Sequence, residues 1–201
     1  MDVKEAIGKR KSIRQYDDGP VSPQVVAEVL DAARRAPSGC NAQPWRFVVV
    51  QDRETVQTLQ QHEAFPQSFV YSAPVLIVCC GDPAAYSGKY GGENQVAEGT
   101  VPEDTEQRKA MFSIVEGKPV VRTIRDVSIA SAFMVLRATE LGLGTSYIGL
   151  INEEALREVL AIPEGLLILF VVAMGYTTHA PLATPRKALN EILIGPGGFR
   201  D

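Results

Sequence analysis

Cysteine, histidine and long apolar runs are all scarce in this 201-residue chain, and each scarcity excludes a class of protein. The three cysteines, Cys40, Cys79 and Cys80, form no CxxC pair, which suits a reducing compartment and predicts no zinc site. No stretch approaches the roughly 20 apolar residues of a membrane-spanning helix, and the first residues lack the apolar run of a signal peptide. We therefore expect a cytoplasmic protein with no membrane partner.

Positive charge and catalytic side chains are scarce as well. The formal net charge of −4 lacks the basic surplus of nucleic-acid-binding proteins, so we expect no nucleic-acid partner. The two histidines, His62 and His179, lie in polar contexts that are typical of surface positions. No GxSxG motif is present, and no cluster of His, Cys and carboxylate residues has metal-ligand spacing. A chain with so few candidate acids, bases and nucleophiles is expected to take its chemistry from a cofactor.

Hydrophobic periodicity predicts an α+β fold in one domain over residues 1–201. Ser22 and Pro23 mark the start of a helix that ends before Pro37. Further helices are predicted at 3–8, 54–61, 125–141 and 153–160, and strands at 46–51, 73–81 and 166–176. The helix over 125–141 is apolar nearly all round, so we expect it to be buried inside the fold or between two subunits.

Two stretches show no clear periodicity. The acidic, glycine-rich segment from about 82 to 123 is interpreted as a lid-like insertion that holds one helix near 103–115. The alternative is that this acidic stretch is an ordinary solvent-exposed surface, for which such a composition is also typical. The proline-containing tail from about 177 to 201 is interpreted as a C-terminal arm.

The basic segment near the N-terminus, "KRKSIR", alternates Arg10, Ser12 and Arg14. In an extended backbone this alternation points all three side chains to one side. Two guanidinium groups and a hydroxyl that converge in this way suit a phosphate. The alternative is a solvated helix end, because cations complement the dipole at a helix C-terminus.

The segment "PSGCNAQPW" places three neutral hydrogen-bonding side chains, Ser38, Asn41 and Gln43, between two prolines. We call residues 37–44 the elbow. By itself the elbow is typical of a helix end whose polar side chains satisfy their own backbone. Trp45 is expected to lie in the core, and Cys40 is assigned no role.

The segment "GLGTSYIG" contains a GxG, but its glycines follow a helix, which is the opposite order to a dinucleotide-binding fingerprint. We interpret Gly142 as a helix C-cap. The glycine-bearing turn that follows is expected to bring its backbone close to another group.

Taken together, these segments resemble the FMN-dependent nitroreductase family. "KRKSIRQY", "APSGCNAQPWRF", "LGLGTSYIG" and "TPRKALNEIL" occur in the order and approximate spacing of that family, between about Lys9 and Ile192. The resemblance implies a central, mostly antiparallel sheet flanked by helices, in an intertwined homodimer that exchanges C-terminal arms. The 82–123 insertion matches no part of the family pattern.

The resemblance also implies, position by position, which residues contact FMN. Arg10, Ser12 and Arg186 would hold the phosphate, and Lys11 would either join them or face water. Arg14 would lie at the N1/O2 edge of the flavin, where its charge would favour the anionic reduced form. The elbow would line the ring, and backbone amides near Leu150 would reach N5 and O4. The remaining implied contacts are Pro37, Ser38, Gly39, Asn41, Gln43, Tyr147, Ile148 and Gly149.

The implied activity is ping-pong hydride transfer from NAD(P)H, through flavin N5, to a small-molecule acceptor such as a nitroaromatic or a quinone. The flavin carries the chemistry, so no side chain is expected to act as general acid or base. Many relatives have a second glycine where this chain has Leu150, which predicts narrower access to N5. The alternatives are specialised flavin chemistry of the dehalogenase or enone reductase type, a non-catalytic FMN-storage protein, and a purely structural protein.

Overall fold

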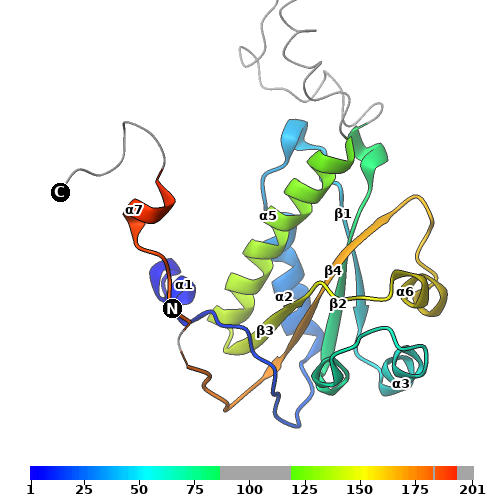
Figure 1. The fold of residues 1–201 in the computed structure, drawn as a ribbon, viewed down its shortest axis with the longest axis horizontal. Coiled ribbons are helices and arrows are strands. Elements are labelled where there is room, and N and C mark those ends of the chain that lie inside the picture. Colours follow the sequence, from blue (N-terminus) through cyan, green and yellow to red (C-terminus); the bar gives the residue numbers. More distant parts are fainter. Residues whose placement is uncertain (87–118, 183, 194–201) are drawn as a thin grey trace, which may run out of the picture.

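The computed structural model describes residues 1–86, 119–182 and 184–193 and confirms the α+β class (Figure 1). Its helices are α1 (Val3–Lys9), α2 (Pro23–Arg34), α3 (Arg53–Gln61), α5 (Pro119–Glu140), α6 (Glu153–Leu160) and α7 (Leu189–Ile192). Its strands are β1 (Trp45–Val50), β2 (Val75–Gly81), β3 (Leu143–Ile148) and β4 (Leu167–Tyr176). The helix predicted near 103–115 lies outside the described residues. Within the described ranges, no helix combines the length and apolar character needed to cross a membrane.

The four strands form one antiparallel sheet in the order β1-β2-β4-β3. Every residue of the central strand β2 is buried, because helices cover both faces of the sheet. Alternate β2 residues, including Ile77 and Cys79, pack with α2 and α5, while Leu76 and Val78 pack on the other face with α3 and α6. Trp45 is buried in the first of these clusters, as predicted.

The longest helix, α5, begins earlier than the sequence pattern predicts, at Pro119 rather than near Arg125. Proline suits a first helical turn, where its missing N–H has no intrahelical partner to lose. Val120 and Val121 are exposed, so this first turn does not extend the buried apolar face that marks the rest of the helix. The C-terminal end is predicted correctly, because Gly142 follows it with a φ of +81°.

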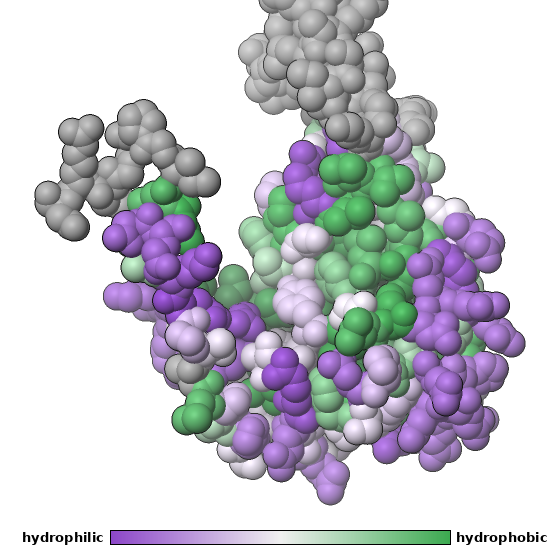
Figure 2. Space-filling view, viewed as in Figure 1, coloured by the Kyte–Doolittle hydropathy of each residue, from purple (hydrophilic) through white to green (hydrophobic). Residues whose placement is uncertain are grey.

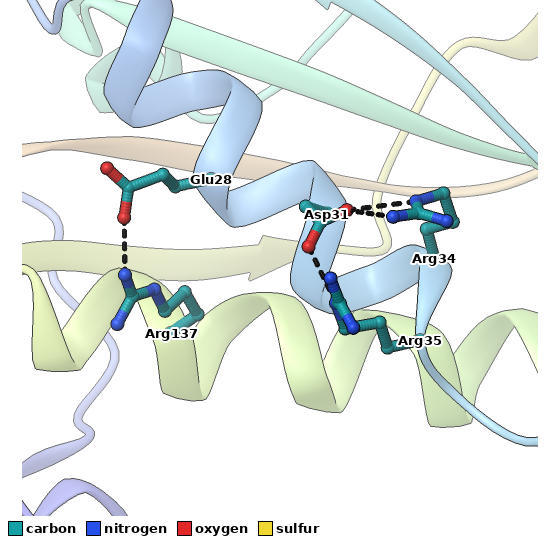
Figure 3. A network of polar contacts seen from close by, with 5 residues as sticks. All are labelled: Glu28, Asp31, Arg34, Arg35 and Arg137. Atoms are coloured by element: carbon teal, nitrogen blue, oxygen red, sulfur yellow. Dashed lines mark hydrogen bonds and ion pairs between the residues drawn. The ribbon is translucent and has the colours of Figure 1, made fainter.

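Helix α5 packs lengthwise against α2, and charged side chains border the contact (Figure 3). Arg137 of α5 forms an ion pair with Glu28 of α2, and Asp31 of α2 pairs with Arg34 and with the C-cap residue Arg35. Exposed pairs of this kind contribute only about 0–1 kcal/mol each. The buried apolar residues between the two helices therefore dominate their association.

One face of α5 is not covered by the described residues of its own chain. Val121, Ile124 and Phe133 are 57%, 43% and 42% exposed. Hydrophobic residues gather over this helix on the face shown in Figure 2. Within the single chain, burial of the helix is therefore confined to the side that faces the sheet and α2, which leaves burial between two subunits as the alternative for the other side.

Beyond β4 the chain leaves the sheet and runs past α1 towards α7, standing apart from the body of the fold (Figure 1). This arm carries apolar side chains that are largely exposed: Leu182 is 94%, Leu189 63% and Ile192 59% exposed. Lys11 links the arm to the N-terminal segment, because its Nζ donates a hydrogen bond to the carbonyl oxygen of Pro181 (2.8 Å).

Candidate functional site

The basic N-terminal segment is extended, as the alternation of its residues requires. Helix α1 ends at its C-cap Arg10, whose φ of −60° and ψ of 120° turn the chain into an extended path. Ser12 then bridges to Thr145 of β3, and the Ile13 N–H donates to the Thr145 carbonyl (2.8 Å). Ile13 is 6% exposed and points into the fold, so its neighbours Ser12 and Arg14 point away from it.

Gly144 explains how the segment can lie so close to β3. A Cβ at this position would stand 2.6 Å from Cγ1 of Ile13, which is closer than real Cβ atoms approach. The predicted close approach of the glycine-bearing backbone is therefore confirmed, and its partner is Ile13. The expected turn is wrong, however, because residues 143–148 form the edge strand β3 rather than a loop.

One cavity of about 710 Å³ is lined by the residues that were assigned to the phosphate. Arg10, Lys11, Ser12 and Arg14 contribute from the N-terminal segment, and Arg186 contributes from the arm. The other lining residues are Ile7, Gly8, Pro181, Leu182 and Thr184. None of the described lining residues is acidic, and none of the four cations forms an ion pair with an acidic side chain in the described ranges. Four positive charges that share a cavity without a counter-charge suit an anion such as a phosphate.

The elbow adopts a backbone that few residues favour. Cys40, Asn41 and Gln43 have φ angles of 53°, 52° and 49°, in the left-handed region that L-residues other than glycine seldom occupy. Strained positions of this kind cost roughly 1–3 kcal/mol each and often occur at binding sites. The Gln43 N–H donates to Oγ of Ser38 (3.0 Å), which closes the elbow on itself. Pro37, Asn41 and Gln43 remain exposed.

The elbow lies against the N-terminal half of α5. The Gly39 N–H donates to Oδ2 of Asp126 (2.8 Å), and Asp126 is only 1% exposed. Asp126 is not among the predicted site residues. A carboxylate among the apolar residues of a buried helix face is the signal that was available, because such a group needs hydrogen-bond partners.

The elbow and the basic cavity are not brought together within one chain. No elbow residue is among those that line the cavity. The elbow contacts α5 at Asp126, whereas Lys11 and Ile13 border a second cavity together with Thr139 of the same helix. Asp126 and Thr139 are separated by about 20 Å along the helix axis at 1.5 Å per residue.

The last group of predicted contacts lies at the end of β3. Tyr147 is half-exposed, and its O–H donates to Oγ of Ser131 (3.0 Å). Burial of the ring raises the pKa of Tyr147 and keeps the phenol neutral. The Ile148 side chain is buried, so only its backbone can face a ligand. Gly149 and Leu150 follow the strand and border a cavity of about 660 Å³.

Neither histidine lines the basic cavity or the cavity beside Leu150. His62 and His179 are both exposed, which confirms that they are surface residues. The described residues likewise contain no group of three or more His, Cys, Asp or Glu side chains that could hold a metal ion.

Comparison with known proteins gives one consistent result. The Nitroreductase family profile matches residues 7–176. A protein of Archaeoglobus fulgidus, named for NADH dehydrogenase and NAD(P)H nitroreductase activity, is 33% identical over 171 residues, covering 83% of this chain and 80% of the relative. An NAD(P)H-dependent FMN reductase of Bacillus subtilis is 26% identical over 187 residues, covering 92% of this chain and 70% of the relative.

Comparison of the fold with solved structures gives the same result. A crystal structure of a nitroreductase family protein from Streptococcus pneumoniae superposes with a TM-score of 0.76 at 25% identity, covering 96% of this chain and 100% of the other. The matched range includes the basic segment, the elbow and β3, which are the elements of the candidate site. The chain therefore belongs to the nitroreductase family.

Proposed function

We propose that this protein is an FMN-dependent oxidoreductase that passes electrons from NAD(P)H to a small electrophilic acceptor. The observation that carries the proposal is the basic cavity, where Arg10, Lys11, Arg14 and Arg186 meet without an acidic counterpart among the described lining residues. Bound FMN would supply the redox chemistry, by accepting a hydride from NAD(P)H and delivering it to the acceptor.

The residues of the cavity fit the phosphate end of FMN. Arg10 and Arg186 can form charge-assisted hydrogen bonds to a phosphate oxygen, and the Ser12 hydroxyl can donate a further one. Lys11 is already engaged with the Pro181 carbonyl, so part of its donor capacity fixes the arm. Arg14 is exposed and can reach beyond the phosphate towards the ring, where its charge would stabilise negative charge on a reduced flavin.

We also propose that a second copy of the chain completes the site. The resemblance assigns the elbow and the basic cavity to one flavin, yet they lie apart in the single chain. The exposed apolar face of α5, with Val121, Ile124 and Phe133, supports a subunit interface along this helix (Figure 2). A dimer formed there would bury this face and bring an elbow from one chain towards the cavity of its partner.

The flavin spectrum is the direct test of this function. Freshly purified protein is expected to absorb near about 450 nm, as oxidised flavins do, and to bleach when NADH or NADPH is added without oxygen. Flavin that does not bleach would contradict the oxidoreductase and favour an FMN-storage protein. Protein that contains no flavin and takes up none from added FMN would contradict the cofactor assignment itself.

Leu150 is expected to restrict which acceptors reach the flavin. Its side chain is 64% exposed at the rim of the cavity that Phe65, Tyr71 and Gly149 also line. In the variant Leu150→Gly, we expect kcat/KM for a bulky fused-ring quinone to rise about tenfold, a transition-state gain of about 1.4 kcal/mol. The value for a single-ring quinone should stay nearly unchanged.

The control for this prediction is Leu150→Ile, which keeps the side-chain volume and should behave as the native protein does. Equal changes for both quinones in Leu150→Gly would show that Leu150 does not select acceptors by size.

A further inference from the structure

Beneath the elbow lies a cluster of polar side chains around the buried Asp126, and none of these side chains belongs to a predicted contact residue. Asp126 is at its centre and accepts three hydrogen bonds: from the Gly39 N–H (2.8 Å), from Arg125 Nε (2.7 Å) and from the Tyr86 hydroxyl. The guanidinium of Arg122 lies 4.0 Å from the centroid of the Tyr86 ring, on which it stacks.

Asp126 remains ionised despite its burial. Burial opposes ionisation, but the three hydrogen bonds outweigh it and hold the pKa of Asp126 below its ordinary value. An uncompensated charge at a position that is 1% exposed would cost several kcal/mol, and the three donors together offset this cost. The buried residues around it on α5 are the apolar Val127 and Ala130 and the hydroxyl-bearing Thr123 and Ser131, so Asp126 is the only charged side chain among the buried residues of this helix.

The unusual backbone of the elbow is held both from within and from α5. Within the elbow, the Asn41 N–H donates to the Ser38 carbonyl (3.0 Å) and the Gln43 N–H donates to Oγ of Ser38 (3.0 Å). From α5, Asp126 accepts from the Gly39 N–H (2.8 Å) and Arg122 donates to Sγ of Cys40 (3.5 Å).

Gly39 lies close to the Asp126 carboxylate and to two guanidinium groups. A Cβ added at this position would lie 3.0 Å from Arg125 Nη2 and 3.1 Å from Arg122 Nη2. Directly after Gly39 come Cys40 and Asn41, both in the left-handed region. The hydrogen bond to Asp126 therefore fixes the N–H of the residue at which the strained stretch begins.

We propose that Asp126 is a positioning residue for the flavin ring: its carboxylate holds Gly39 and so sets the path of Cys40, Asn41 and Gln43. The Arg125 and Tyr86 side chains keep that carboxylate aimed at the elbow from two other directions. The inference rests on the proposed function, because it takes the elbow to be the surface that meets the ring. It adds a residue on α5, far from the elbow in sequence, on which the geometry of that surface depends.

The test compares Asp126→Asn with the native protein in FMN binding. The asparagine keeps the shape and can still accept from Gly39 and Tyr86, which share one carboxylate oxygen, but its amide group then takes the place of the other oxygen and sets a donor against Arg125 Nε. We expect the dissociation constant for FMN to rise about 10- to 100-fold. With saturating FMN, we also expect the visible band of the bound flavin to shift, because the surroundings of the ring change.

Two further variants make the test decisive. Tyr86→Phe removes one donor and leaves the carboxylate, so it should weaken FMN binding in the same direction by about threefold. The matched control is Thr123→Val, one turn earlier on the buried face of α5, where the Thr123 hydroxyl has no hydrogen-bond partner within the described residues. This isosteric change should leave both the dissociation constant and the flavin band unaltered.

The possible outcomes separate a failure of the positioning role of Asp126 from a failure of the proposed function. A folded Asp126→Asn protein with the native dissociation constant and the native flavin band would overturn the positioning role, while the proposed function would stand. A lower melting temperature with unchanged binding would mean that Asp126 serves stability alone, which also overturns the role. If native protein binds no FMN, the proposed function itself has failed. If Asp126→Asn does not fold, Tyr86→Phe decides, because native-like binding in that variant would overturn the proposal.

Discussion

Replacing Arg10 and Arg14 together by alanine is expected to give a folded protein that purifies without flavin. Both side chains line the basic cavity, and neither forms an ion pair with an acidic side chain in the described ranges. Their loss therefore removes ligand contacts without leaving a buried partner exposed or unpaired. A hydrogen bond to a charged group is worth about 1.5–3 kcal/mol, so two of them correspond to a rise of roughly 10²- to 10⁴-fold in the dissociation constant for FMN.

The measurement is a titration of apo-protein with FMN, followed by flavin fluorescence, together with a thermal melt of each variant. The control is Lys4→Ala with Lys9→Ala, which removes two positive charges from the same end of the chain. Lys9 pairs with Glu5 on the exposed surface of α1, and its loss should cost little. If the Arg10→Ala, Arg14→Ala protein is yellow and binds FMN with the native dissociation constant, the assignment of these residues to the phosphate and to the edge of the ring is wrong.

The basic segment illustrates what a local pattern can predict. The alternation of Arg10, Ser12 and Arg14 predicts that an extended backbone points them to one side, and all three line one cavity. The helix start at Ser22 is also confirmed, because its side chain accepts from the Val25 N–H at the N-terminus of α2. Both features depend on residues only a few positions apart, so the necessary information lies within one short window.

Strand β3 shows where local patterns fail. Residues 143–148 read as a glycine-bearing turn, yet they pair with β4 and carry a parallel bridge to Ser12. Gly144 weakens the intrinsic preference for a strand, and the strand forms because it pairs with β4 along its whole length, with Ile13 packed closely over that glycine. The deciding contact joins residues far apart in the chain, so propensity at 143–148 could not reveal it.

Like the fold, the candidate site could be predicted only where it depends on residues close together in the sequence. The composition of the elbow predicts a stiff, neutral, polar surface, and Asn41 and Gln43 are indeed exposed on it. Its left-handed backbone at Cys40 could not be predicted, because that conformation is favoured by glycine and is imposed here by tertiary contacts. Asp126 supplies one such contact across 87 positions, which no short motif records.

Removing all residues after Thr177 is expected to convert the proposed dimer into a monomer at micromolar concentration. The arm exposes Leu182, Leu189 and Ile192 to solvent in the single chain. Full burial of such side chains is worth about 1.5–3 kcal/mol each, so three of them contribute at most about 5–9 kcal/mol to association. A loss of even half that amount raises the dimer dissociation constant more than about 30-fold.

Sedimentation velocity across a concentration series measures this change directly. The truncation also removes Arg186, which lines the basic cavity, so Arg186→Ala alone is the matched control. That variant should bind FMN more weakly and sediment as the native dimer does, because the arm and its apolar side chains are intact. A truncated chain that still sediments as a dimer at micromolar concentration would contradict arm exchange. In that case the exposed face of α5, with Val121, Ile124 and Phe133, would be sufficient to hold the two subunits together.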